Sequence, residues 1–510
     1  MTQAARYTNV LEFLENTAAS DPDRILVTDG QKELSRSGLM EVSRRVASGL
    51  LNSAARRSPV IVYMEKTTDT LTAFFGAVYA GAFYTLIDPQ LPSARLLQIQ
   101  QSLKTQTVIT DDEHLEQARE LFEGCRIFRI SMLQESGINE EGLARIREKH
   151  LDTDPLYVNF TSGSTGVPKG VLICHRSVID FITCFVNEFG IREDDVIANQ
   201  APLDFDVSVK DIYSSLLTGA KLALVPRPLF TTPAPLLDFL CEQETTVMIW
   251  AVSALCLVSA FHGLEYRVPE KVRLVMFSGE VMPPKRLSNW MEHLPQAEFV
   301  NLYGPTEITC NCTFHRIERS RDYTEGIPIG ASFANEETFL LDEEDREVTE
   351  PGVTGQICVR GTAVGLGYWN MPQQTKERFR EDPRTPEYAS VIYCTGDLGR
   401  YNERGELMFC GRMDDQIKYM GHRIELAEVE LAINAVDGVE RSCCVFDEKK
   451  SRLYAFYCGT IERGDLIQKL KERLPVFMIP GVFKQVESMP VTGRGKIDRR
   501  ALMEEMKNKK

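Results

Sequence analysis

Short apolar runs rich in β-branched residues, separated by segments of helical spacing, constrain the fold of this chain most strongly. The runs are "SPVIVYM" (58–64), "TQTVITD" (105–111), "LYVNFTS" (156–162), "KLALVP" (221–226), "TTVMIWAV" (245–252) and "VRLVMFSG" (272–279). Residues 33–53 have helical spacing, and "LTAFFGAVYAGAFYTLI" (71–87) is typical of a helix followed by a strand. Strands that alternate with helices predict an α/β fold with a largely parallel sheet.

The pattern changes twice towards the C-terminus. After about residue 325, short strands and turns such as "GQICVRG" (355–361) and "GELMFCG" (405–411) predict a small β-rich, barrel-like subdomain. From residue 422 the order helix, strand, strand, helix predicts a small α+β domain. We therefore expect a large N-terminal domain of layered α/β subdomains over residues 1–413 and a small mobile domain over 414–510.

Composition excludes several classes of function. The net charge is −15, and no stripe of lysine and arginine is long enough to follow a nucleic-acid backbone. The N-terminus lacks a signal-peptide pattern, and no apolar run reaches the roughly 18–20 residues of a membrane span. Thirteen cysteines without regular spacing indicate reduced thiols and a cytoplasmic protein. Cys310, Cys312 and His315 could share a metal, but no fourth ligand lies at a recognisable spacing.

The stretch "TSGSTGVPKG" (161–170) is a candidate phosphate-binding loop. Backbone amides and hydroxyls around one turn form a nest for an anion, and Lys169 adds a positive charge. Its spacing matches neither the ordinary P-loop nor the dinucleotide fingerprint. The candidate phosphate ligands are Thr161, Ser162, Gly163, Ser164, Thr165, Gly166 and Lys169.

Further motifs follow in a fixed order. They are "FDVSVKD" (205–211), "NLYGPTE" (301–307), "YCTGDLGR" (393–400), "GRMDDQIKYMGHRIELAEVE" (411–430) and "GKIDRRAL" (495–502). Together with the glycine-rich loop, they resemble the adenylate-forming superfamily from about residue 10 to residue 502. The nearest branch is the amino-acid-activating one, the adenylation domains of nonribosomal peptide synthetases.

The resemblance implies that a carboxylate attacks the α-phosphate of ATP, giving an acyl-adenylate and pyrophosphate. It places the loop on the β- and γ-phosphates, and Thr306 and Glu307 beside the α-phosphate and Mg²⁺, with Glu307 as the metal ligand. The other implied ATP contacts are Tyr303 stacked on adenine, Asp397 on the ribose hydroxyls and Arg412 near the ribose or phosphate.

The family also rotates its C-terminal domain between two half-reactions. By resemblance, Asp414 is the hinge, and Lys496 bridges the substrate carboxylate and the phosphate in the first step. The turn that begins at Lys418 then enters for thioester formation in the second step.

An α-amino acid is the implied substrate, because Asp206 matches the aspartate that pairs with the substrate ammonium group. The other implied contacts are Val207, Lys210, Trp250, Met276, Ser278, Leu302, Cys310 and Asn311. Lys210 leaves two alternatives open. It pairs either with a side-chain carboxylate of a glutamate-like substrate or with Asp206 on the same helix face.

The acceptor is expected to be the phosphopantetheine thiol of a separate carrier protein, because the chain ends eight residues after Leu502 and contains no carrier motif. The first alternative is a D-alanine–carrier protein ligase, which "GEVMP" (279–283) also resembles, although Ser278 stands where that group generally has cysteine. The second is an acyl- or aryl-CoA ligase. The third is an ATP-binding protein without catalytic activity.

Overall fold

The computed structural model describes residues 7–163, 166–413, 416–447, 450–490, 497 and 499–508. By its internal contacts the chain divides into two compact units. The first unit is Met1–Pro89, Thr105–Asn159 and Val171–Met413, and the second is Gln90–Lys104, Phe160–Gly170 and Asp414–Lys510. The expected domains, 1–413 and 414–510, differ from these units by the two short segments 90–104 and 160–170, and they stay a prediction about which parts move together.

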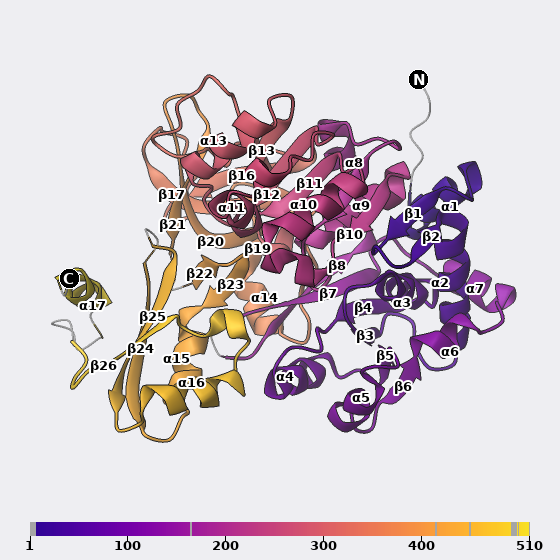
Figure 1. Cartoon of the computed structure of the whole chain (residues 1–510), viewed down its shortest axis with the longest axis horizontal. Helices are drawn as coiled ribbons and strands as arrows, with labels where there is room; N and C mark the ends of the chain where they lie inside the picture. Colours follow the sequence, from indigo (N-terminus) through magenta and orange to yellow (C-terminus); the bar gives the residue numbers. More distant parts are fainter. Residues whose placement is uncertain are drawn as a thin grey trace. The chain divides into compact units, whose positions relative to one another are not determined.

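The larger sheet of the first unit has a parallel centre with antiparallel strands at its edges (Figure 1). Its strands lie in the order β15 (Ala331–Ser332), β14 (Thr313–Arg316), β13 (Glu298–Tyr303), β12 (Leu274–Ser278), β11 (Val247–Ala251), β9 (Val196–Asn199), β10 (Lys221–Leu224), β1 (Ile25–Thr28) and β2 (Glu33–Ser35). This parallel centre agrees with the alternation of strands and helices in the sequence.

Two further sheets complete the strands of this region. One has the order β18 (Gly367–Tyr368), β8 (Lys169–Cys174), β7 (Pro155–Thr161), β4 (Phe83–Leu86), β3 (Pro59–Tyr63), β5 (Thr107–Thr110) and β6 (Arg126–Arg129). The other is antiparallel, with the order β16 (Glu336–Leu341), β17 (Thr354–Gly361), β20 (Val391–Tyr401) and β19 (Phe379–Glu381), and with β21 (Leu407–Arg412) paired to β20. This antiparallel sheet lies where the sequence predicts the β-rich subdomain.

Helices bury both faces of the larger sheet. The helices that pack into the first apolar core are α1 (Leu11–Ser20), α2 (Arg36–Leu50), α3 (Thr68–Tyr79), α8 (His175–Phe189) and α9 (Val207–Thr218). The second core receives α10 (Pro233–Glu242), α11 (Val252–Ala260), α12 (Gly263–Tyr266) and α13 (Pro284–His293). Shorter helices are α5 (Leu115–Leu121), α6 (Ile130–Gln134), α7 (Glu140–Arg147), α14 (Pro372–Arg378), η1 (Arg227–Thr231) and η2 (Thr306–Ile308).

The segment 33–53, which the spacing predicts to be helical, forms two elements. Glu33–Ser35 pairs with β1 as the edge strand β2, and helix α2 begins at Arg36. The Ser35 side chain accepts a hydrogen bond from the backbone N–H of Gly38 and thereby caps the helix. A serine cap therefore fixes the start of α2 inside the predicted segment.

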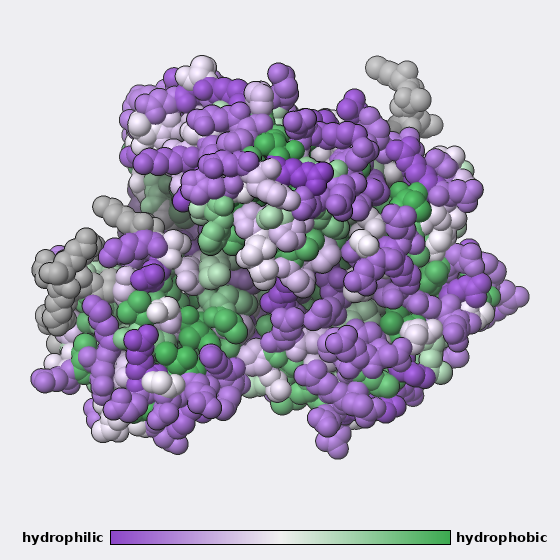
Figure 2. Space-filling model, viewed as in Figure 1, coloured by the Kyte–Doolittle hydropathy of each residue, from purple (hydrophilic) through white to green (hydrophobic). Residues whose placement is uncertain are grey.

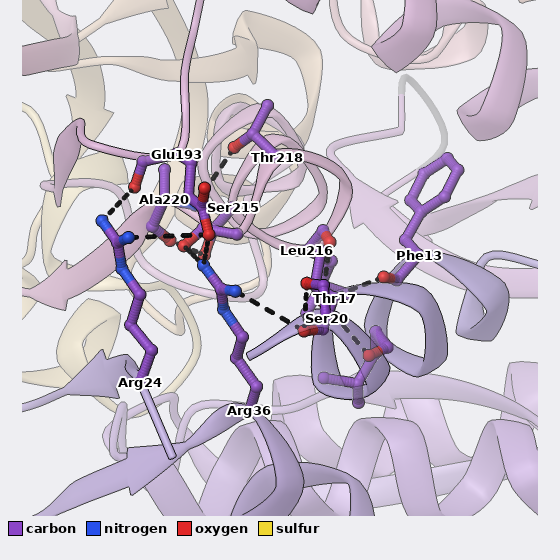
Figure 3. A network of polar contacts seen from close by, with 12 residues as sticks. Phe13, Thr17, Ser20, Arg24, Arg36, Glu193, Ser215, Leu216, Thr218 and Ala220 are labelled. Carbon is purple, nitrogen blue, oxygen red and sulfur yellow. Dashed lines mark hydrogen bonds and ion pairs between the residues drawn. The ribbon is translucent and has the colours of Figure 1, made fainter. Parts of the chain in front are cut away.

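Arg36 is a fully buried cation that joins three helices (Figure 3). Its guanidinium donates to the Glu193 carboxylate at 2.7 Å, to the Gly219 carbonyl at 2.8 Å and to the Thr17 carbonyl at 3.5 Å. Gly219 ends α9 with φ +76°, and a Cβ there would lie 2.3 Å from the Arg36 Nη2 atom. The position therefore favours glycine both for its left-handed backbone and for the close approach of Arg36.

The second unit is an α+β structure in its C-terminal part, as the sequence predicts. Its elements are α4 (Ser93–Leu103), β22 (Gln416–Tyr419), β23 (His422–Glu425), α15 (Leu426–Asn434), β24 (Val439–Asp447), β25 (Arg452–Gly459), α16 (Arg463–Lys471), η3 (Val476–Met478), β26 (Val482–Gln485) and α17 (Arg499–Asn508). The strands β24, β25 and β26 form one sheet, and α15 and α16 pack on it through an apolar core.

Hydrophilic residues cover most of the face shown in Figure 2, and hydrophobic residues reach it only in patches. Within the described residues, no helix combines the length and the apolar character that crossing a membrane requires.

We predict that Arg36→Met lowers the free energy of unfolding by about 3 kcal/mol, because Glu193 and two buried carbonyl groups lose a charged donor. Urea denaturation followed by tryptophan fluorescence measures the change. Arg24→Met is the matched control, since Arg24 contacts the same Glu193 from a side chain that is 39% exposed. The control should shift the free energy by less than about 1 kcal/mol; equal losses in the two variants would contradict the role given to burial.

Candidate functional site

The carboxyl ends of four parallel strands lie at one edge of the larger sheet. Strands β9, β11, β12 and β13 run parallel, and helix α9 follows β9, so the start of α9 lies at this edge too. In open α/β sheets, ligands bind outside the carboxyl ends of the strands. Most of the predicted site residues of the first unit come from these strand ends and the loops that follow them.

Asp397, Arg412 and Tyr303 form a buried polar group. Asp397 and Arg412 are register partners on β20 and β21, and their side chains form an ion pair. The Tyr303 hydroxyl donates to the Asp397 carboxylate at 2.5 Å. Burial and the neighbouring Asp397 carboxylate raise the pKa of Tyr303 well above its usual value, so the hydroxyl stays protonated and remains a donor. The structure therefore joins three residues that the sequence placed at the nucleotide.

Glu307 lies in the short helix η2 and is fully buried. Its carboxylate accepts a hydrogen bond from the Tyr368 hydroxyl at 2.7 Å, while its backbone carbonyl accepts one from the Gly365 amide at 2.8 Å. Thr306 begins the same short helix and is partly exposed. The sequence did not indicate Tyr368 as a partner of Glu307, because no spacing rule links residues that lie 61 positions apart.

A tight turn follows η2 and carries two of the predicted substrate contacts. Thr309 and Cys310 have left-handed backbones, with φ +54° and φ +80°. A Cβ at Gly304 would lie 2.4 Å from the Cα atom of Asn311, so only glycine lets the two segments approach this closely. Non-glycine residues hold such conformations at a cost in energy, and the surrounding contacts must fix them.

The turn is tied to the start of helix α9. The Cys310 thiol donates to the backbone carbonyl of Asp206 at 2.8 Å, and the Lys210 ammonium donates to the Asn311 side-chain oxygen. Burial raises the pKa of the Cys310 thiol well above its usual value, so it stays protonated as a donor. The structure therefore brings Asp206, Lys210, Cys310 and Asn311 together, and their role as substrate contacts stays a prediction.

Three members of the predicted pocket belong to the first apolar core, whereas Trp250 belongs to the second. Met276, Leu302 and Cys310 belong to the first apolar core, Ser278 ends β12, and Val207 begins α9. Trp250 lies on the other face of β11, in the second core, where its indole N–H donates to the Ala198 carbonyl.

Ile249, the residue before Trp250, faces the first core and pairs in register with Met276. Successive side chains on a strand point to opposite faces, so an assignment that is off by one residue moves a side chain across the sheet. The structure therefore replaces Trp250 with Ile249 as the residue of β11 on the same face as the other members.

The glycine-rich loop belongs to the second unit. Gly166 has φ +78°, and a Cβ at Gly163 would lie 2.1 Å from the Val167 carbonyl oxygen, so both glycines are required by the turn. The Gly163 amide donates to the Glu428 carboxylate at 3.2 Å, and the Ser162 hydroxyl donates to the Arg423 carbonyl at 2.7 Å. A carboxylate on a loop amide shows that this turn presents a donor to an anion.

Glu428 is a contact of this loop that the sequence reasoning missed. It forms an ion pair with Arg95 of helix α4, and burial raises the pKa of its carboxyl group while Arg95 opposes that shift. Glu428 lies in the motif 411–430, but the spacing of that motif does not indicate a contact with Gly163.

The remaining predicted residues of the second unit are placed only in part. Thr161 ends β7 and Lys169 begins β8, so they flank the loop, and Lys418 lies in β22, in register with Arg423. Ser164, Thr165, Asp414 and Lys496 lie outside the described residues.

Metal-binding side chains do not gather in the part of the chain that the structure describes: it contains no group of three or more histidine, cysteine, aspartate or glutamate residues suited to hold a metal ion. His315, one of the three residues considered in the sequence for such a site, forms a hydrogen bond between its Nε2 atom and the Tyr323 hydroxyl at 3.0 Å.

Comparison with known proteins gives consistent results. The AMP-binding enzyme family matches residues 14–369. Tyrocidine synthase 1 of Brevibacillus parabrevis is 28% identical over 506 residues, which cover 97% of this chain and 45% of that protein. The chain thus spans less than half the length of this curated relative.

Solved structures support the same fold. The Vibrio cholerae adenylation domain AlmE, in complex with glycyl-adenosine-5′-phosphate, has a TM-score of 0.85 at 21% identity and covers 100% of this chain and 99% of its own. A nonribosomal peptide synthetase protein containing adenylation and PCP domains has a TM-score of 0.82 at 22% identity, over 98% of this chain and 84% of its own. The predicted α/β fold and superfamily are confirmed: the chain belongs to the AMP-binding enzyme family and has the fold of nonribosomal-peptide-synthetase-type adenylation domains.

Proposed function

We propose that this protein activates an α-amino acid with ATP, forming an aminoacyl-adenylate and pyrophosphate, and then transfers the aminoacyl group to the phosphopantetheine thiol of a separate carrier protein. The observation that carries the proposal is the buried Asp397–Arg412–Tyr303 group in a chain of the AMP-binding enzyme family. A carboxylate held in place by a cation and a phenol suits the recognition of a ribose diol, whose hydroxyl groups are donors.

The reaction joins two anions, so positioning and neutralisation of charge dominate catalysis. In this proposal the loop 161–170 binds the β- and γ-phosphates, Tyr303 packs against adenine and Arg412 neutralises charge near the α-phosphate. Asp206 binds the ammonium group of the amino acid and Lys496 bridges the reacting carboxylate and phosphate. Thr306 donates its hydroxyl to the same phosphate.

Mg²⁺ fits the residues present. Magnesium is usually held by one or two carboxylates together with substrate phosphates, and Glu307 supplies one buried carboxylate beside the partly exposed Thr306. When bound, the ion would offset the negative charge of the phosphates. The Tyr368 hydroxyl donates to one oxygen of the Glu307 carboxylate and thereby orients this carboxylate for the proposed role.

Transfer to a carrier protein is supported by the similar structure of a nonribosomal peptide synthetase protein that contains adenylation and PCP domains. In this part of the proposal, Asp414 is the hinge between the 1–413 and 414–510 domains, and the turn after Lys418 approaches the thiol. Met420 and Gly421 in that turn have left-handed backbones, and Met420 is 56% exposed.

ATP–pyrophosphate exchange that depends on an amino acid tests the first half-reaction. We expect exchange with at least one member of a panel of the twenty common amino acids and D-alanine, and none without an amino acid. Lys496→Ala should abolish exchange while leaving the Kd for ATP within about threefold, because it removes only charge stabilisation in the transition state.

The outcomes separate the alternatives. Undiminished exchange by the Lys496→Ala protein would refute the role of that lysine, and an inactive panel would refute amino-acid activation. Release of AMP with coenzyme A alone, without a carrier protein, would identify a CoA ligase.

Asp397→Asn should raise the KM for ATP about 10- to 100-fold, because a hydrogen bond to a charged acceptor contributes about 1.5–3 kcal/mol. Exchange kinetics at varied ATP concentration measure the effect. Arg400→Met on the same strand is the control, since Arg400 is exposed. Equal KM values for the two variants would contradict the assigned role of Asp397.

Removal of divalent ions with EDTA should stop exchange, and added Mg²⁺ should restore it. Glu307→Gln should raise the Mg²⁺ concentration for half-maximal exchange at least tenfold, since an amide oxygen binds a hard cation less strongly than a carboxylate. An unchanged Mg²⁺ requirement would exclude Glu307 as the ligand.

A further inference from the structure

We propose that the activated substrate is an amino acid with a side-chain carboxylate, and that Lys210 binds this carboxylate. The inference rests on the proposed function and extends it by naming the class of substrate. It depends on the position, burial and partners of one ammonium group.

Lys210 is a fully buried cation in the first turn of helix α9. The N-terminal end of a helix carries a partial positive charge, so this position disfavours a cation. The ammonium donates to the side-chain oxygen of Asn311, which is a neutral acceptor. Among the described residues, no aspartate or glutamate oxygen lies within 4.0 Å of it.

Three other buried cations among the described residues have carboxylate partners. Arg36 pairs with Glu193, Arg95 with Glu428, and Arg412 with Asp397. A buried charge without a counter-ion is costly to the folded state, so proteins pair such charges. A bound anion would therefore give the Lys210 ammonium a charged partner in addition to the neutral oxygen of Asn311.

Asp211, the next residue, does not supply the missing charge in full. Its carboxylate accepts a hydrogen bond from the Asn199 side chain at 2.7 Å. Burial raises the pKa of Asp211 to about 7, against the opposing effects of Asn199, Lys210 and Lys66. At neutral pH the Asp211 carboxyl group is consequently protonated in a large fraction of the molecules. Its hydrogen-bond partner is Asn199 and not Lys210.

Asp206 and Lys210 carry opposite charges one helical turn apart, a rise of about 6 Å along the axis. Asp206 is partly exposed at the start of α9, whereas Lys210 is buried deeper, beside Asn311 and the apolar side chains of the first core. A ligand with an ammonium group at one end and a side-chain carboxylate at the other matches both charges. A neutral side chain would leave the ammonium with Asn311 alone.

Asn311 acts as a positioning residue for this ammonium. Its turn is fixed by the left-handed Thr309 and Cys310, by the close approach of Gly304 and by the bond from Cys310 to Asp206. An uncharged oxygen can hold the ammonium in place without neutralising it. This arrangement keeps the positive charge available for the substrate.

The first test compares matched pairs in the exchange assay: glutamate with glutamine and aspartate with asparagine, each as both stereoisomers, with alanine and D-alanine beside them. We expect at least a 100-fold higher kcat/KM for one acidic amino acid than for its amide. Preference for an amide or an apolar amino acid would overturn the inference while leaving amino-acid activation intact. Exchange with no amino acid would instead refute the proposed function.

The second test uses Asn311→Asp, which places a carboxylate of the protein beside Lys210. We expect a higher Tm without substrate, because the buried charge gains a counter-ion, and at least a 100-fold weaker Kd for the acidic amino acid in calorimetry. Both readouts are independent of turnover. A lower Tm together with unchanged binding of the acid would overturn the inference.

Lys210→Met completes the set. It should raise the KM for the acidic amino acid at least 100-fold and leave the KM for ATP unchanged. Lys221→Met is the matched control, because the Lys221 ammonium also donates to an amide oxygen, that of Gln243 at 3.1 Å, but at the start of β10. Equal kinetics in the two variants would show that Lys210 has only a structural role.

Discussion

Burial of both faces of the parallel sheet is the constraint on which the first unit depends. Strands β9, β11, β12 and β13 each have one set of side chains in the first apolar core and the other set in the second. Because alternate residues must point to opposite faces, the register of every central strand is strongly specified. The same register decides which residues reach the carboxyl edge, where the candidate site lies.

Buried charge is the second constraint, and the protein meets it with pairs that join distant elements. Arg36 connects the start of α2 to the end of α9, and Asp397 connects β20 to β21 and to Tyr303 at the end of β13. Each pair fixes the position of backbone that carries candidate site residues. Lys210 differs from these pairs, since its described partner is the neutral side-chain oxygen of Asn311.

Sequence reasoning was reliable where the signal is local. Alternating strands and helices predicted the α/β class, and the glycine-rich stretch 161–170 was expected to form a turn, which the backbones of Gly163 and Gly166 confirm. It was less reliable where a single position matters. Trp250 and Ile249 are equally apolar neighbours, so only their register against Met276 shows which one faces the first core. The serine cap that starts α2 at Arg36 likewise divides a segment whose spacing alone predicts one helix.

The sequence by itself determined the family, the α/β class and the chemical groups available to the site, because motifs and periodicity are properties of neighbouring residues. Only the tertiary structure decided the partner of each group. Lys210 and Asn311 lie 101 positions apart and Tyr303 and Asp397 lie 94 apart, and no local rule relates such positions. The sequence suggested Asp206 as a protein partner for Lys210, whereas in the structure the Lys210 ammonium donates to Asn311. Packing of α9 against the turn after η2 brings Lys210 and Asn311 together, and this contact fixes the position of the Lys210 charge.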